Sequence, residues 1–141
     1  MSAQSGAEAG RHLQLALKFL EEGEELIEKD PVQASGKLYK VAEEAVKALA
    51  VALDLEQAEA AAREGGWRAK PLNRAAAEKL GLEELALWWK AAFHLHVEGS
   101  REARLDSENV RRNLKYVEAF VRAAEKLKPP DAPENRRAEA A

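Results

Sequence analysis

A chain of 141 residues, 46% of them hydrophobic, is long enough for one domain with one hydrophobic core. Its 22 basic and 25 acidic side chains leave a formal net charge of −3, which excludes a general electrostatic attraction to nucleic acid or anionic membranes. There is no cysteine, so disulfides, thiolate metal sites and cysteine nucleophiles are excluded. The sequence shows no secretory signal and no apolar run of membrane-spanning length, and we therefore expect a cytoplasmic protein without a membrane partner.

Hydrophobic residues at helical spacing predict two long helices in the first half of the chain. The first should cover about residues 7–29, after a capping box at residues 5–8. Asp30 and Pro31 suit the N-cap and first turn of the second, which should cover about residues 31–53. This second helix has the most regular apolar stripe in the chain, which predicts the central helix of a bundle. The stripe consists of Leu38, Val41, Ala42, Ala45, Val46, Leu49 and Leu53.

Shorter helices are expected between residues 54 and 81. Residues 54–64 should continue the second helix or form a short one, which Gly65-Gly66 would end. After a connector, Pro71 should open another short helix that Gly81 terminates.

Two further long helices complete the predicted fold, over residues 82–105 and, after an Asp106 cap, over residues 107–128. We expect one domain over residues 1–128 and a disordered tail over residues 129–141, which have too little apolar content to order themselves. No segment alternates with the two-residue period of a strand. The predicted fold class is therefore all-α, an antiparallel bundle of four long and one or two short helices.

The predicted helix over residues 82–105 has two apolar sides. Trp89 and His96 should share the inward side, where His96 is readily explained as a hydrogen-bonded core residue. Trp88 and Leu95 should form a second apolar edge. Because monomers seldom expose large apolar patches, this edge is a candidate dimer contact.

Catalytic and metal-binding patterns are missing from the sequence. There is no Gly-rich phosphate loop, no nucleophile elbow and no Glu-x-x-His pair. His94 and Glu98 could share a metal ion at i,i+4 spacing, but a third ligand is lacking. The neighbouring Glu43 and Glu44 should point apart on their helix. We therefore predict no catalytic residue, metal or cofactor.

Basic residues predominate after residue 100, with eight bases against five acids up to residue 128. With His96, the candidate binding residues are Arg101, Arg104, Arg111 and Arg112. They could receive the phosphates of RNA or a nucleotide, with Trp67 or Tyr116 as a stacking surface. The alternative is that these arginines form salt bridges with the Glu-rich first helix, within a monomer or across a dimer.

Two segments resemble known families. ASGKLYKVAEEAVKALAVAL resembles the first helical pair of HEPN-type domains, and AAFHLHVEGSREARL resembles the signature of the archaeal PaREP family. Together the likeness covers roughly residues 10–125. It implies a HEPN-like helical bundle, commonly a dimer, from a thermophile.

HEPN ribonucleases carry an Arg followed, after four to six residues, by a His, and no Arg of this chain has a His at that spacing. His96 and Arg101 stand in the reverse order. The sequence therefore predicts a non-catalytic dimeric module for a nucleotide, RNA or protein partner. Two alternatives are an RNA-cleaving enzyme that uses His96, Arg101 and Arg104, and an accessory subunit of a nucleotidyltransferase.

Overall fold

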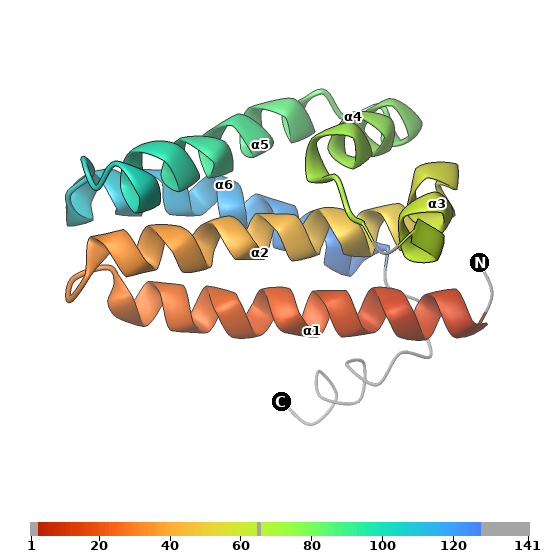
Figure 1. The fold of residues 1–141 in the computed structure, drawn as a ribbon, viewed down its shortest axis with the longest axis horizontal. Helices are drawn as coiled ribbons and strands as arrows, with labels where there is room; N and C mark the ends of the chain where they lie inside the picture. Colours follow the sequence, from red (N-terminus) through yellow and green to blue (C-terminus); the bar gives the residue numbers. More distant parts are fainter. Residues whose placement is uncertain (1–2, 65, 128–141) are drawn as a thin grey trace.

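The computed structural model describes residues 3–64 and 66–127, and all regular structure within them is helical (Figure 1). The elements are α1 (Ala3–Leu26), α2 (Pro31–Ala52), α3 (Glu56–Glu64), α4 (Ala69–Leu80), α5 (Glu84–His94), the π-helical η1 (Leu95–Arg101) and α6 (Ser107–Lys126). The predicted all-α bundle is confirmed, with α1, α2, α5–η1 and α6 as its long members. The predicted tail over residues 129–141 lies outside the described residues. Within the described part, no helix is both long and apolar enough to cross a membrane.

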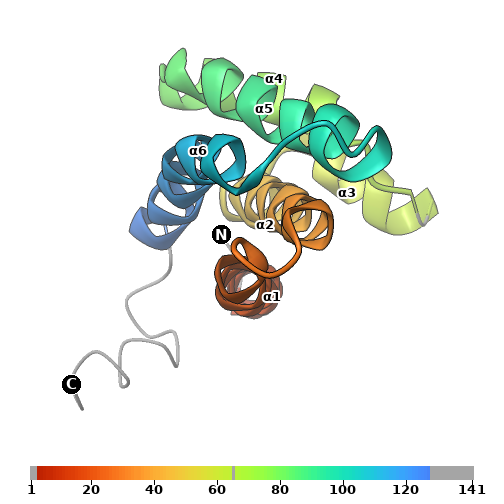
Figure 2. The same cartoon turned by 90° about the vertical axis from the view of Figure 1, so that its left-hand side faces the viewer.

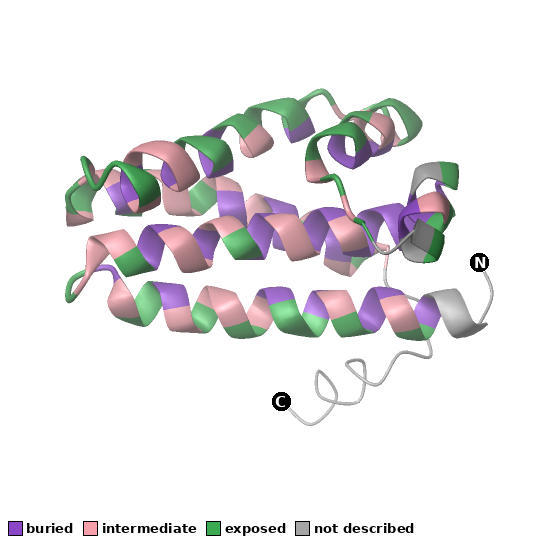
Figure 3. Cartoon of the chain, in the orientation of Figure 1, coloured by how far each residue is buried: buried purple, intermediate pink, exposed green. Residues whose placement is uncertain are grey.

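Helix α2 is the centre of the bundle, as its stripe predicted. It contacts each of the other helical elements, and in Figure 2 it lies between α1 and α5 with α6 beside it. Buried residues recur along its whole length (Figure 3). Six residues of the predicted stripe have no exposed surface, and Leu53, just past the helix end, is half-buried. The small side chains of Ala42 and Ala45 allow neighbouring helices to approach α2 closely.

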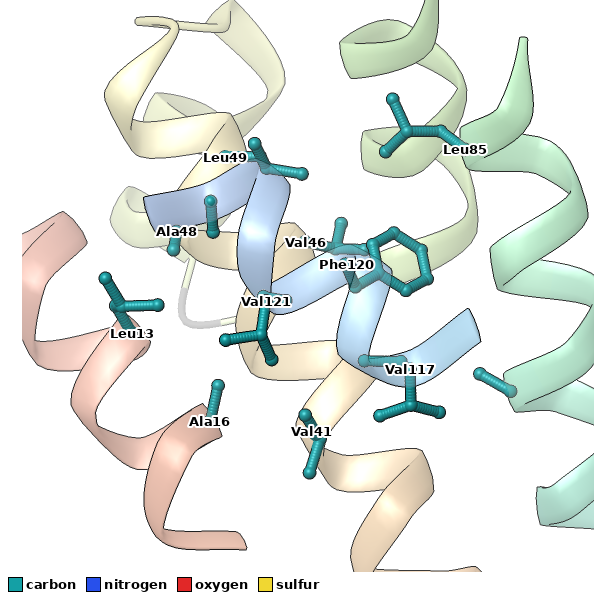
Figure 4. Packing of buried hydrophobic residues seen from close by; sticks show 14 of the residues in the cluster. Leu13, Ala16, Val41, Val46, Ala48, Leu49, Leu85, Val117, Phe120 and Val121 are labelled. Carbon is teal, nitrogen blue, oxygen red and sulfur yellow. The ribbon is translucent and has the colours of Figure 1, made fainter. Parts of the chain in front are cut away.

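The core between α2 and α6 is organised around Phe120, the largest fully buried side chain (Figure 4). Val117 and Val121 of the same helix flank it and are buried. Phe120 lies on the buried face of α6 because positions 117, 120, 121 and 124 follow the i, i+3, i+4, i+7 pattern of a wide apolar face.

Helix ends follow the local signals in most places. The Asp30 carboxylate accepts a hydrogen bond from the Gln33 amide (3.1 Å), and that of Asp106 accepts one from the Asn109 amide (2.9 Å). Gly81 ends α4 in the left-handed conformation, with φ of 68°. The predicted start of the first helix was wrong. Helix α1 begins at Ala3, so the expected cap at residue 5 lies inside the helix.

The helix predicted over residues 82–105 changes character at Leu95, where α5 passes into η1. There the pair Gly99-Ser100 lies against Ser35-Gly36 of α2. A methyl group on Gly99 would overlap the side chain of Ser35, which is fully buried and donates a hydrogen bond to the Pro31 carbonyl (2.8 Å). A methyl group on Gly36 would meet only the Ser100 hydroxyl, at 3.2 Å. Helices η1 and α2 can therefore cross this closely only because Gly99 has no side chain.

We expect the substitution Gly99→Ala to destabilise the protein by about 1–3 kcal/mol through overpacking. Alanine is favoured over glycine in a helix by about 1 kcal/mol, so this result would have the opposite sign to helix propensity. Gly36→Ala is the matched control and should be neutral or slightly stabilising. Urea denaturation followed by circular dichroism measures both. A Gly99→Ala variant as stable as the parent would contradict the close crossing.

Candidate functional site

A cleft of about 570 Å³ opens between α2, the connector before α4, and α5. In Figure 1 this connector, residues 66–68, passes in front of α2 to reach α4. The volume lies within the range of roughly 300–1,000 Å³ that is typical of small-molecule sites. The lining residues are Tyr39, Glu43, Trp67, Arg68, Ala69, Lys70, Pro71, Trp89, Lys90 and Phe93.

Tyr39 of α2 is the centre of an aromatic group on one side of the cleft. Its ring lies 5.6 Å from that of Trp89 and 6.5 Å from that of Phe93, measured between centroids. His96 stacks on the same ring at 4.2 Å. Burial, together with the nearby Glu43 carboxylate, raises the pKa of Tyr39 to about 12. The Tyr39 hydroxyl therefore stays protonated at neutral pH and can donate a hydrogen bond.

Trp67 of the connector is the second aromatic surface, and two helices hold it. The His12 ring of α1 packs edge-on against it at 5.5 Å, and the Lys47 ammonium of α2 lies 5.7 Å from its centroid. The Glu44 carboxylate accepts hydrogen bonds from His12 Nδ1 (2.8 Å) and Lys47 Nζ (3.1 Å). Burial acts to raise the pKa of Glu44, but these hydrogen bonds outweigh it and hold that pKa below the ordinary value. Glu44 thus orders the two side chains that position Trp67.

Glu43 has the opposite surroundings, although it is the next residue. Its side chain lines the cleft, and within residues 3–64 and 66–127 no hydrogen bond or ion pair holds its carboxylate. Burial raises the pKa of Glu43; Lys47 lowers it and Glu44 raises it to a smaller extent. The two carboxylates do point apart, as the sequence predicted, and Glu43 is the one that a ligand could reach.

Three cations accompany this single carboxylate at the cleft. Arg68 and Lys70 come from the connector and the start of α4, and Lys90 comes from α5. All three are exposed, and in the described part of the chain no carboxylate pairs with them. The acidic and histidine side chains of that part do not gather in threes that could hold a metal ion. The cleft therefore combines aromatic surfaces with a net positive charge.

The arginines predicted as binding residues mostly have carboxylate partners. Arg104 pairs with Glu98 (3.2 Å) and Glu102 (3.4 Å). Arg112 pairs with Glu108 (2.9 Å), one turn away on α6, and Arg111 pairs with Glu28 just past α1.

Arg101 is exposed and has no partner among the described residues. No hydrogen bond or ion pair within that same part of the chain joins His96 to Arg101 or Arg104. Instead, His96 adjoins the cleft through Tyr39.

The candidate dimer edge of Trp88 and Leu95 is corrected at one position. Leu95 has no exposed surface, because α5–η1 packs against both α2 and α6 and so buries two of its sides. It cannot contact a partner subunit. Trp88 is half-buried and packs edge-on against Phe120 at 5.7 Å. The large apolar side chain that α5 exposes beside it is Leu87, at 52%.

Several cleft residues were missed from sequence. Tyr39 and Phe93 were not considered, and Trp89 was assigned to the inward side of its helix. One signal was present: Tyr39, Glu43 and Lys47 follow at four-residue spacing on the polar side of α2. An aromatic residue on the polar face of an otherwise regular amphipathic helix indicates a surface with a function beyond the core.

The opposite pKa shifts of the neighbouring glutamates predict opposite effects on stability. Glu44 stabilises the fold above its unfolded-state pKa, and this contribution is lost as the pH falls through its lowered folded-state pKa. Glu44→Gln should therefore cost about 1 kcal/mol at pH 7, with a smaller difference below pH 4.

Glu43 binds its proton more tightly when folded, so its ionised form disfavours folding at pH 7. Glu43→Gln should raise the melting temperature at pH 7. Calorimetry across pH 3–8 measures the change in melting temperature that each variant causes. Changes of the same sign at pH 7 would contradict these assignments.

Comparison with known proteins supports the family resemblance. The chain is similar to a Sulfolobus solfataricus protein of known crystal structure, with 35% sequence identity and a TM-score of 0.70. The similarity covers 79% of this chain and 94% of that one. No curated protein sequence matches. The model of the archaeal PaREP1/PaREP8 family matches residues 11–121, most of the chain. This protein therefore belongs to the archaeal PaREP1/PaREP8 family.

Proposed function

We propose that this chain is a cytoplasmic, non-catalytic module that binds a nucleotide in the aromatic cleft, either free or as part of an RNA. One observation carries the proposal: four aromatic side chains and three cations surround a cavity of about 570 Å³. In the proposal, residues 1–128 act as one HEPN-like domain, without the Arg–His spacing of HEPN ribonucleases.

The aromatic side chains suit a planar ligand. Trp67 lines the cleft, and Trp89 and Phe93 line it beside Tyr39. Phe93 keeps 47% of its surface exposed, so the group is not sealed by its own packing. Stacking of a base on such a ring contributes about 1–3 kcal/mol and tolerates any base. The rings therefore favour a nucleobase over a flexible aliphatic ligand.

The charges distinguish a nucleotide from the other ligand class that aromatic clefts bind. Aromatic cages also bind quaternary ammonium groups, by attraction of the cation to the ring faces. Here Arg68, Lys70 and Lys90 would repel a cation and attract a phosphate. The proposal assigns the phosphate contacts to these three residues, since Arg104, Arg111 and Arg112 already have carboxylate partners.

Isothermal titration with nucleoside monophosphates should show saturable binding, and the matching nucleosides should bind more weakly for lack of the phosphate. Trp89→Ala should weaken binding by about tenfold or more because a stacking surface is lost. Lys70→Gln combined with Lys90→Gln should weaken binding and reduce its salt dependence. Lys126→Gln, an exposed lysine of α6 outside the cleft, is the matched control.

A short single-stranded RNA, titrated in parallel, distinguishes free nucleotide from RNA as the ligand. The proposal fails if neither the mononucleotides nor the RNA bind at millimolar concentration. It also fails if the protein degrades the RNA and His96→Ala abolishes that activity, because the RNA-cleaving alternative would then hold.

We further propose that the module is a homodimer and that the exposed side of α5 forms the contact. Leu87 is 52% exposed, and the adjacent Trp88 is half-buried. Leu87→Glu should weaken self-association by tenfold or more, because burying a leucine contributes about 1.5–3 kcal/mol. Sedimentation velocity over a concentration series measures this. A parent protein that stays monomeric at tens of micromolar would refute the dimer.

A further inference from the structure

The α2 side of the cleft places a carboxylate between the two aromatic surfaces. Tyr39, Glu43 and Lys47 succeed one another at four-residue spacing, about 6 Å apart along the helix axis. The Tyr39 end meets Trp89, and the Lys47 end meets Trp67. Glu43 therefore lies one helical turn from the residue that meets each aromatic surface, a separation that the edge of a stacked base can span.

Glu43 is available to such an edge. Its neighbour Lys47 is already hydrogen-bonded to Glu44, and His96 stacks on Tyr39. Within residues 3–64 and 66–127, no donor satisfies the Glu43 carboxylate, although its side chain is partly buried. A partly buried carboxylate without donors gains more from a ligand that supplies two N–H groups than an exposed one does.

The four common bases differ in what they present on the Watson–Crick edge. Guanine presents two neighbouring donors, N1–H and the 2-amino group, which match the two oxygens of one carboxylate. Adenine and cytosine present a donor beside an acceptor, and uracil presents one donor between two acceptors. An ionised carboxylate accepts only, so it meets a repelled lone pair on each of these three bases.

We infer that the base bound in the cleft is guanine and that Glu43 recognises it through N1–H and the 2-amino group. This inference rests on the proposed nucleotide-binding function and goes beyond it, since stacking and phosphate contacts do not distinguish bases. The phosphate would then lie toward Arg68, Lys70 and Lys90.

Titration of the full-length protein with GMP, IMP and AMP tests the inference. GMP should bind about tenfold or more tightly than AMP, as expected for a bidentate pair. IMP, which keeps N1–H and lacks the 2-amino group, should fall between them. Glu43→Gln should bring GMP affinity close to that of AMP, and AMP affinity should not fall, because the repulsion between the carboxylate and the adenine lone pair is removed. Glu118→Gln, a half-exposed glutamate of α6 outside the cleft, should preserve the preference.

The outcomes separate this inference from the proposed function. Equal binding of GMP and AMP, or a preference that survives Glu43→Gln and Glu43→Ala, overturns guanine recognition and leaves nucleotide binding intact. Equal binding of GMP and IMP likewise overturns the two-donor contact. Absence of binding by all three nucleotides and by RNA overturns both. Circular dichroism of each variant shows that the fold is retained.

Discussion

Close packing of small residues around α2 is the constraint on which the rest of this structure depends. A helix surrounded by neighbours can be contacted on every side only if its own side chains are small at the crossings. Ala42 and Ala45 meet this need within α2, and glycines meet it from outside. A methyl group on Gly23 of α1 would come within 2.8 Å of Leu38, and one on Gly99 would overlap Ser35. The neighbouring helices are thus held at defined positions along α2.

The same packing creates the cleft. With Gly99 seated against Ser35, the preceding turns of α5 place Trp89 and Phe93 beside Tyr39. The connector is positioned from its other end, because Asn73 of α4 donates a hydrogen bond to the Leu85 carbonyl (3.2 Å). Helix α2 therefore contributes to the apolar core on one side and lines the candidate site on the other.

Electrostatics divides the basic residues into two groups with different roles. Those around the α5–α6 junction are largely matched by nearby glutamates, which makes them part of the solvated surface and of local stability. The cations at the cleft have no such partners in the described part of the chain, while the one carboxylate among them, Glu43, also lacks a donor. A mildly acidic protein can thus present a locally positive site.

The sequence by itself determined the features that depend on neighbours within one or two turns. Apolar periodicity located the helices and the central place of α2, and Asp30, Gly81 and Asp106 marked helix ends, because caps and stripes are local properties. The family resemblance was also present in the sequence.

The tertiary structure alone decided which surfaces meet. The burial of Leu95, the π-helical turn after it and the use of Trp89 at the cleft follow from how α5–η1 crosses α2 and α6. Tyr39, Trp67 and Trp89 lie on separate elements of the chain, so a local sequence pattern could not predict that they line one cleft. Sequence reasoning placed the candidate site at the conspicuous arginines. We propose the aromatic cleft instead, whose rings meet only through long-range contacts, whereas Arg104 and Arg112 pair with glutamates close by in the sequence.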